Sequence, residues 1–205
     1  YLAFYDSVSG VMSWENSLIQ TSNSGSTWSL ITTPLIWPDE VSAIGIYQDS
    51  ILCVGGEDGS FYLSKNKGQS WPYAWSFFNS HVVKDFSFLS KDTIFALSIK
   101  GGLAKTINGG TNWTDSYVPV YSAYGITFKN KQEGYAVGAD VNGYGVIAKT
   151  TNMGASWTAF PTQFYSTFFN IELVNDSIAL VSGSNGILLM WNYKTALITG
   201  DKELD

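Results

Sequence analysis

Six carboxylates in the sequence have the chemical type needed for acid–base catalysis: Asp39, Glu40, Glu57, Asp58, Asp85 and Asp115. Two carboxyl groups can cleave a glycosidic bond when one acts as the acid and the other as base or nucleophile. Carboxylates in turn-rich segments are more often solvated charges, because a buried carboxylate needs a partner. We therefore expect these six to be loop charges, and a hydrolytic pair stays the alternative.

The sequence has one histidine, His81, and one cysteine, Cys53. A single His cannot build a His-rich metal site, and the run from His81 to Asp85 is typical of a loop that enters a strand. Cys53 lies in the apolar run ILCVGG, which predicts a small buried side chain. The neighbours Glu57 and Asp58 do not form a dense oxygen-ligand loop for calcium. We therefore expect no catalytic residue, no metal and no cofactor.

Charge and hydropathy make several classes of function unfavourable. The formal net charge is −6, which does not favour nucleic acid or an anionic membrane as a partner. All 11 basic residues are Lys, so the chain cannot supply a bidentate guanidinium clamp. No apolar run approaches the roughly 20 residues of a membrane-spanning helix.

A string of eight residues occurs four times at a nearly constant spacing. The copies are TSNSGSTW, SKNKGQSW, TINGGTNW and TTNMGASW, and their starts are 43, 42 and 44 residues apart. We call this string the box. Its Asn, Gly and Trp positions are Asn23, Gly25, Trp28, Asn66, Gly68, Trp71, Asn108, Gly110, Trp113, Asn152, Gly154 and Trp157. Repetition at one period predicts a structural role for the box.

Each repeat unit contains four runs of β-favouring residues separated by Gly, Asn and Asp. Four strands in about 42 residues is the period of a β-propeller blade. The sequence thus predicts one all-β domain, residues 1–205, with blades at about 1–37, 38–80, 81–119, 120–163 and 164–205. In the fifth unit the box is reduced to 190–193. A closed five-bladed ring is the first choice, and part of a larger ring is the alternative.

The box itself fits a tight turn between the third and fourth strands. Its Asn can accept hydrogen bonds from backbone N–H groups two residues further on. Its Gly supplies a positive φ. We expect its Trp to fold back between strands and bury a large surface.

The box resembles the repeat of the Asp-box, or BNR-repeat, β-propellers, whose consensus is Ser-x-Asp-x-Gly-x-Thr-Trp. Asn replaces Asp in all four copies. Together with the run GYAVG, the pattern looks most like the branch related to photosystem II assembly and stability factors, many of whose relatives are secreted or periplasmic bacterial proteins. The resemblance implies a propeller in the cell envelope or outside the cell. Sialidases of this fold use an Arg triad, which this chain lacks.

The face opposite the boxes is where we expect binding, because there the units differ from one another. The candidates are Trp14, Glu15, Trp37, Asp39, Glu57, Asp58, His81, Tyr121, Tyr124, Tyr144 and Tyr165. Trp14 aligns with small residues of the other units, Gly55, Ser98, Gly138 and Ser182. It either fills a gap beside the first blade or offers its ring to a ligand.

These features predict a monomeric, non-catalytic scaffold that binds a protein or peptide. The alternative is a carbohydrate-binding or glycoside hydrolase-like propeller, which would need Trp14 and Trp37 exposed and roughly coplanar. A third alternative is a repeat module of a longer surface protein.

Overall fold

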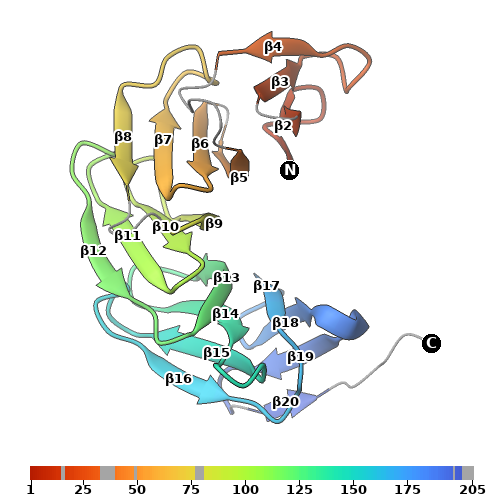
Figure 1. The fold of residues 1–205 in the computed structure, drawn as a ribbon, viewed down its shortest axis with the longest axis vertical. Coiled ribbons are helices and arrows are strands. Elements are labelled where there is room, and N and C mark those ends of the chain that lie inside the picture. Colours follow the sequence, from red (N-terminus) through yellow and green to blue (C-terminus); the bar gives the residue numbers. More distant parts are fainter. Residues whose placement is uncertain (15–16, 33–39, 49, 77–80, 196, 200–205) are drawn as a thin grey trace. The chain divides into compact units, whose positions relative to one another are not determined.

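The computed structural model describes residues 1–14, 17–32, 40–48, 50–76, 81–195 and 197–199. In this part of the chain, five antiparallel sheets of four strands follow one another in sequence order (Figure 1). This architecture matches a five-bladed β-propeller and confirms the predicted fold class. Glu15, Trp37 and Asp39, three of the predicted binding residues, lie outside the described residues. Within the described part, no helix is long and apolar enough to cross a membrane.

The strands have the following bounds. The first sheet contains β1 (Leu2–Phe4), β2 (Gly10–Trp14), β3 (Ser17–Thr21) and β4 (Ser29–Ile31). The second contains β5 (Val41–Tyr47), β6 (Ile51–Gly56), β7 (Ser60–Ser64) and β8 (Tyr73–Ser76). The third contains β9 (Val83–Phe88), β10 (Ile94–Ser98), β11 (Gly102–Thr106) and β12 (Thr114–Tyr117). The fourth contains β13 (Ser122–Phe128), β14 (Gly134–Ala139), β15 (Gly145–Thr150) and β16 (Thr158–Pro161). The fifth contains β17 (Phe168–Leu173), β18 (Ile178–Gly183), β19 (Leu188–Asn192) and β20 (Leu197–Thr199), with a 3-10 turn at Ser184–Gly186.

The chain divides into two compact units. The first unit contains Tyr1–Ser98 and Ala104–Thr114, and the second contains Ile99–Leu103 and Asp115–Asp205. The division falls within the third sheet. Each sheet lies inside one of the five sequence ranges expected for a blade.

Apolar clusters between consecutive sheets form the core of each unit. In the first unit, Val11 and Leu18 of the first sheet pack with Leu52 and Val54 of the second. In the second unit, Tyr135 of the fourth sheet packs with Trp191 of the fifth, and their ring centroids are 5.1 Å apart. The inner strands β6, β10 and β14 are buried along their whole length, which explains their continuous apolar runs. Cys53 of β6 is fully buried, as the sequence predicted.

The box forms the same hydrogen-bonded turn in each copy. In the copy at 150–157, the Thr150 hydroxyl oxygen accepts the N–H of Gly154 at 3.0 Å. The side-chain oxygen of Asn152 accepts the N–H of Ser156 at 2.9 Å. The prediction that this Asn bonds two residues further on was wrong, because the acceptor reaches the residue four positions on. The Gly of each box has a positive φ, between 76° and 87°.

The box tryptophans differ in their surroundings. Trp113 is buried and meets Phe61 of the second sheet edge-on, with centroids 4.8 Å apart. Trp28, Trp71 and Trp157 are only half-buried. The expectation of a plug between strands of one blade was therefore too simple, since Trp71 and Trp113 also join their sheets to the preceding one.

The fifth sheet has a different turn at this place. Residues 190–192 belong to β19, so the prediction that the reduced box lies at 190–193 was wrong. The turn follows instead, where the side-chain oxygen of Asn192 accepts the N–H groups of Lys194 and Thr195 at 3.1 and 3.2 Å.

Candidate binding surface

Strand register places the boxes and the candidate binding loops at opposite ends of the fourth sheet. At one end, Ala139 pairs with both Ser122 and Gly145. At the other end, Gly134 pairs with Thr150, where the box begins. At the end away from the box, Tyr121 precedes β13, Tyr144 precedes β15, and Tyr165 lies between β16 and β17.

Tyr144 and Tyr165 form an exposed aromatic pair at this end. Their ring centroids are 5.6 Å apart and the rings meet at 80°. Tyr144 is 40% exposed and Tyr165 is 71% exposed. The loop before Tyr144 is fixed by Asp140, whose Oδ1 accepts the N–H groups of Asn142 and Tyr144 at 2.8 and 2.9 Å. A hydrogen-bonded turn therefore positions the ring of Tyr144, against which the ring of Tyr165 packs.

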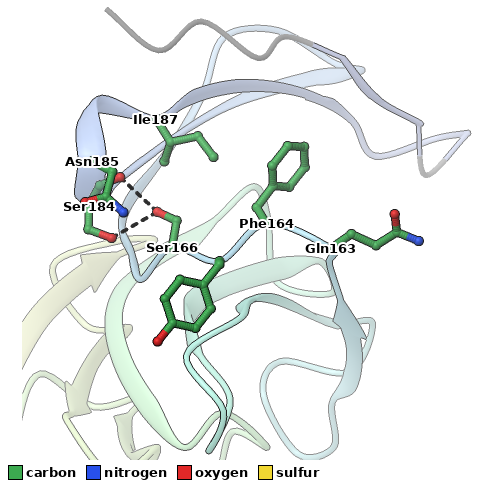
Figure 2. A pocket seen from close by; sticks show the side chains of 7 residues that line it. Gln163, Phe164, Ser166, Ser184, Asn185 and Ile187 are labelled. Carbon is green, nitrogen blue, oxygen red and sulfur yellow. Dashed lines mark hydrogen bonds between the residues drawn. The ribbon is translucent and has the colours of Figure 1, made fainter.

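A pocket of about 270 Å³ lies beside this pair and is lined by Gln163, Phe164, Tyr165, Ser166, Ser184, Asn185 and Ile187 (Figure 2). Its wall is fixed by two hydroxyl groups. The Ser166 hydroxyl donates to the backbone oxygen of Ser184 at 2.9 Å. The Ser184 hydroxyl oxygen accepts the N–H of Thr167 at 3.0 Å. Figure 2 shows the side chains of Ser166 and Ser184 directed toward each other at the edge of the pocket.

Further Tyr residues are exposed in the same unit. Tyr121 is 53% exposed, and the Lys100 ammonium lies over its ring, 4.4 Å from the centroid. Tyr117, at the end of β12, is 60% exposed. Tyr124, by contrast, is half-buried. Its ring packs edge-on against that of Phe169, with ring centroids 5.3 Å apart. We call Lys100, Tyr117, Tyr121, Tyr144, Tyr165 and the pocket the aromatic surface.

The other predicted binding residues that the structure describes lie in the first unit. Asp58 is half-buried, and its Oδ1 accepts the N–H and the hydroxyl of Ser60 at 2.7 and 2.6 Å, so this carboxylate fixes a turn. Glu57 is exposed and His81 is half-buried. No group of three or more His, Cys, Asp or Glu residues that could hold a metal occurs among the described residues.

Trp14 is 57% exposed, and it lies on a face of the first sheet. It pairs with Ser17 in the register of β2 and β3. In the first sheet, Trp14 lies four residues after Gly10, which pairs with the first residue of the box, Thr21. In the second sheet, Leu52 pairs with the first residue of the box, so the residue equivalent to Trp14 is Gly56. The alignment of Trp14 with Gly55 was therefore wrong by one residue.

The sequence did not identify five lining residues of the pocket: Gln163, Ser166, Ser184, Asn185 and Ile187. Asn185 has a φ of 58° and Gly186 a φ of 70°, so this turn uses left-handed backbone. The dipeptide Asn-Gly is a turn signal, but it does not reveal that the turn borders a pocket.

Solved structures support the fold. The chain is similar to a structure described as YCF48 bound to D1 peptide, with a TM-score of 0.74, 15% identity, and coverage of 99% of this chain and 66% of that chain. It is also similar to a chain of the mitotic checkpoint complex (TM-score 0.78, 11% identity, 99% and 65% covered) and to U3-55K (TM-score 0.80, 12% identity, 99% and 66% covered). The chain thus spans about 65% of the length of these three similar chains. No family model and no curated protein matches it. At these identities the similarity shows the fold alone, and the fold is that of a β-propeller.

Proposed function

We propose that this protein is a non-catalytic scaffold that binds a protein or peptide through the aromatic surface of the second unit. The observation that supports this most strongly is Tyr165. Its ring is 71% exposed, yet it is held edge-on by Tyr144 next to a pocket. A large side chain left in water at such a place has an energetic cost that a bound partner would remove.

A peptide fits the chemistry of this surface better than a small molecule does. Tyr rings supply contact area with little loss of side-chain entropy, and their hydroxyl groups can bond to peptide N–H and C=O groups. The pocket volume of about 270 Å³ is slightly below the range for drug-sized ligands, and this size suits a single side chain. Lys100 adds one positive charge beside Tyr121. One propeller of similar fold, YCF48, has a peptide bound to it, and a bound peptide is therefore compatible with this architecture.

Selection from a library of random displayed peptides tests the proposal. The immobilised chain is expected to enrich peptides that share a large apolar or aromatic residue, because such a residue would fill the pocket. Enriched peptides should bind the variant Tyr165→Ala more weakly.

The matched control is Val174→Ala. Val174 is 55% exposed and lies in the turn after β17, at the opposite end of the fifth sheet. This variant should bind the enriched peptides as the unmodified chain does. Failure to enrich any peptide, together with binding to glycans on an array, would contradict the proposal and favour the carbohydrate alternative.

We also propose that the boxes place this chain with the Asp-box propellers, and that it acts in the cell envelope or outside the cell. Both proposals rest on the box pattern and its resemblance. Expression of the full gene followed by fractionation tests the location. Recovery of the protein only from the cytosol would contradict it.

A further inference from the structure

The first strand of four sheets has a β-bulge at the same place. In each case one residue stands between two consecutive partners and has no residue opposite it: Ser42 in β5, Lys84 in β9, Tyr124 in β13 and Phe169 in β17. A bulge bends its strand and redirects the side chain of the extra residue. The bulge is thus a common feature of these sheets, whereas the residue that it redirects differs from one sheet to the next.

The two aromatic bulge residues lie in the second unit, where β13 and β17 lie side by side (Figure 1). A Cβ on Gly125, the residue after Tyr124, would lie 3.0 Å from the backbone oxygen of Phe169 and from the Cα of Asn170. The glycine therefore lets the two backbones approach closely at the bulges. The rings of Tyr124 and Phe169 meet edge-on there, with centroids 5.3 Å apart. We call these two residues the bulge pair.

The bulge pair has the same geometry as the pair of Tyr144 and Tyr165. The interplanar angle is 79° in the bulge pair and 80° in the other. Tyr124 is half-buried, whereas the ring of Phe169 is 46% exposed. As with Tyr165, a neighbouring ring holds a large apolar side chain in water, and a bound partner would remove the energetic cost of this exposure.

One short segment carries the more exposed ring of each pair. Tyr165 and Phe169 are four residues apart. Between them, the Ser166 hydroxyl donates to the backbone oxygen of Ser184, and the Thr167 N–H donates to the Ser184 hydroxyl oxygen. Four residues of fully extended chain span at most about 14 Å, so the Cα atoms of Tyr165 and Phe169 are no farther apart than that. A peptide of a few residues is long enough to contact both rings.

We propose that the bulge pair is a second subsite of the peptide site and binds a second large apolar residue of the same peptide. This inference rests on the proposed function and defines its partner more closely. The first apolar residue fills the pocket beside Tyr165, and the second packs on the ring of Phe169. In an extended peptide, alternate residues face the same side. The second apolar residue should therefore lie two or four positions from the first.

Two substitutions of Phe169 test the subsite with a peptide selected on the unmodified chain. Phe169→Ala removes the ring and should weaken binding at least about fivefold, as truncation of a contact residue at an interface does. Phe169→Leu keeps apolar bulk and should retain most of the affinity. The control Val174→Ala lies at the opposite end of the same sheet and should leave the affinity unchanged. Thermal melts check that each variant is folded.

A double-mutant cycle separates direct contact from a general disturbance of the site. An alanine scan of the peptide first identifies its two apolar residues. Replacing the second one by Ala should weaken binding to the unmodified chain at least about fivefold and should have little further effect on binding to Phe169→Ala. Such non-additivity is expected only when the two side chains interact. Fluorescence anisotropy measures the four affinities.

The outcomes distinguish the subsite from the proposed function on which it rests. If Tyr165→Ala weakens binding but Phe169→Ala does not, the second subsite is wrong and the proposed function stands. The same conclusion follows if Phe169→Ala weakens both peptides equally, or if the scan finds only one apolar residue that matters. If no selected peptide depends on Tyr165, the subsite and the proposed function are both wrong.

Discussion

The ring of Tyr165 meets the ring of Tyr144 edge-on, with centroids 5.6 Å apart and an interplanar angle of 80°. This geometry is the favourable one for two aromatic quadrupoles. It holds Tyr165 in place although most of its ring is in water. The Asp140 turn fixes Tyr144 in the same loop, so the pair is organised before any partner arrives. A preorganised surface loses less entropy on binding.

The Asn of the box should be replaceable by Asp but not by Ala. The Oδ1 of Asn66 accepts the Ser64 hydroxyl at 2.8 Å and the Ser70 N–H at 2.9 Å. Asn66→Ala removes both bonds and should lower the free energy of unfolding by about 1–2 kcal/mol. Asn66→Asp keeps both, and the Ser70 hydroxyl can turn to donate to the new carboxylate. It should stay within about 0.5 kcal/mol of the unmodified protein. Urea denaturation measures both changes, and equal losses would contradict this account of the turn.

Two box glycines with the same backbone conformation should differ in their tolerance of Ala. Gly25 has a φ of 84° and Gly110 a φ of 87°. A Cβ on Gly25 would meet Trp28 at an ordinary 3.6 Å, whereas a Cβ on Gly110 would lie 2.6 Å from the buried Leu63. Gly25→Ala should cost only the left-handed backbone, about 1–2 kcal/mol. Gly110→Ala should cost roughly 1–3 kcal/mol more from overpacking. Equal denaturation midpoints for the two variants would show that the boxes do not pack against the preceding sheet.

Acid should weaken the second unit through Glu133. Burial raises the pKa of this carboxyl, but hydrogen bonds from Lys149 and Tyr135 and the charges of Lys149 and Lys129 outweigh it, so the pKa lies below its ordinary 4.5. The Lys149 Nζ is 2.7 Å from Glu133 Oε1. Because the folded-state pKa is the lower one, the stabilisation is complete above about pH 4.5 and is lost as the pH falls through the folded-state value.

Glu133→Gln keeps the shape of the side chain but cannot ionise. The free energy of unfolding of this variant should therefore vary less between pH 6 and pH 3 than that of the unmodified protein. The difference should correspond to the titration of one carboxyl group. Thermal melts across this range measure the difference. Parallel pH profiles for the two proteins would show that Glu133 does not contribute.

Cys53 should not react with thiol reagents while the protein is folded. Its side chain is fully buried, and burial raises the pKa of the thiol, so both access and thiolate are lacking. Labelling should follow global unfolding and become rapid in denaturant. Fast labelling of the native protein would contradict the burial of β6.

The repeat period allowed the fold to be predicted from the sequence, because each box marks the same turn between the third and fourth strands. The hydrogen bonds of the box were harder to predict. The hydrogen bond from the Ser156 N–H to the Asn152 side-chain oxygen depends on two successive left-handed residues, Met153 and Gly154, that close the turn. Gly154 is a clear sequence signal of left-handed backbone, whereas Met153 gives no such signal.

The proposed binding surface was predicted only in part. Tyr144 and Tyr165 were identified as loop residues, but their edge-on contact depends on how the Asp140 turn approaches the next loop. The pocket wall at Ser166 and Ser184 forms through a bond across 18 residues of sequence. The exposure of Trp14 depends on what packs on the first sheet, and a local pattern does not contain that information.

The affinity of a selected peptide for the double variant Tyr144→Ala, Tyr165→Ala tests the central claim most directly. Truncation of aromatic residues at the centre of an interface commonly costs at least about 2 kcal/mol, which is roughly a thirtyfold change in Kd. Fluorescence anisotropy with a labelled peptide should therefore show binding weakened by at least tenfold, while Val174→Ala leaves the Kd unchanged and both variants keep their thermal midpoints within a few degrees. An unchanged Kd for a correctly folded double variant would contradict the assignment of binding to the aromatic surface.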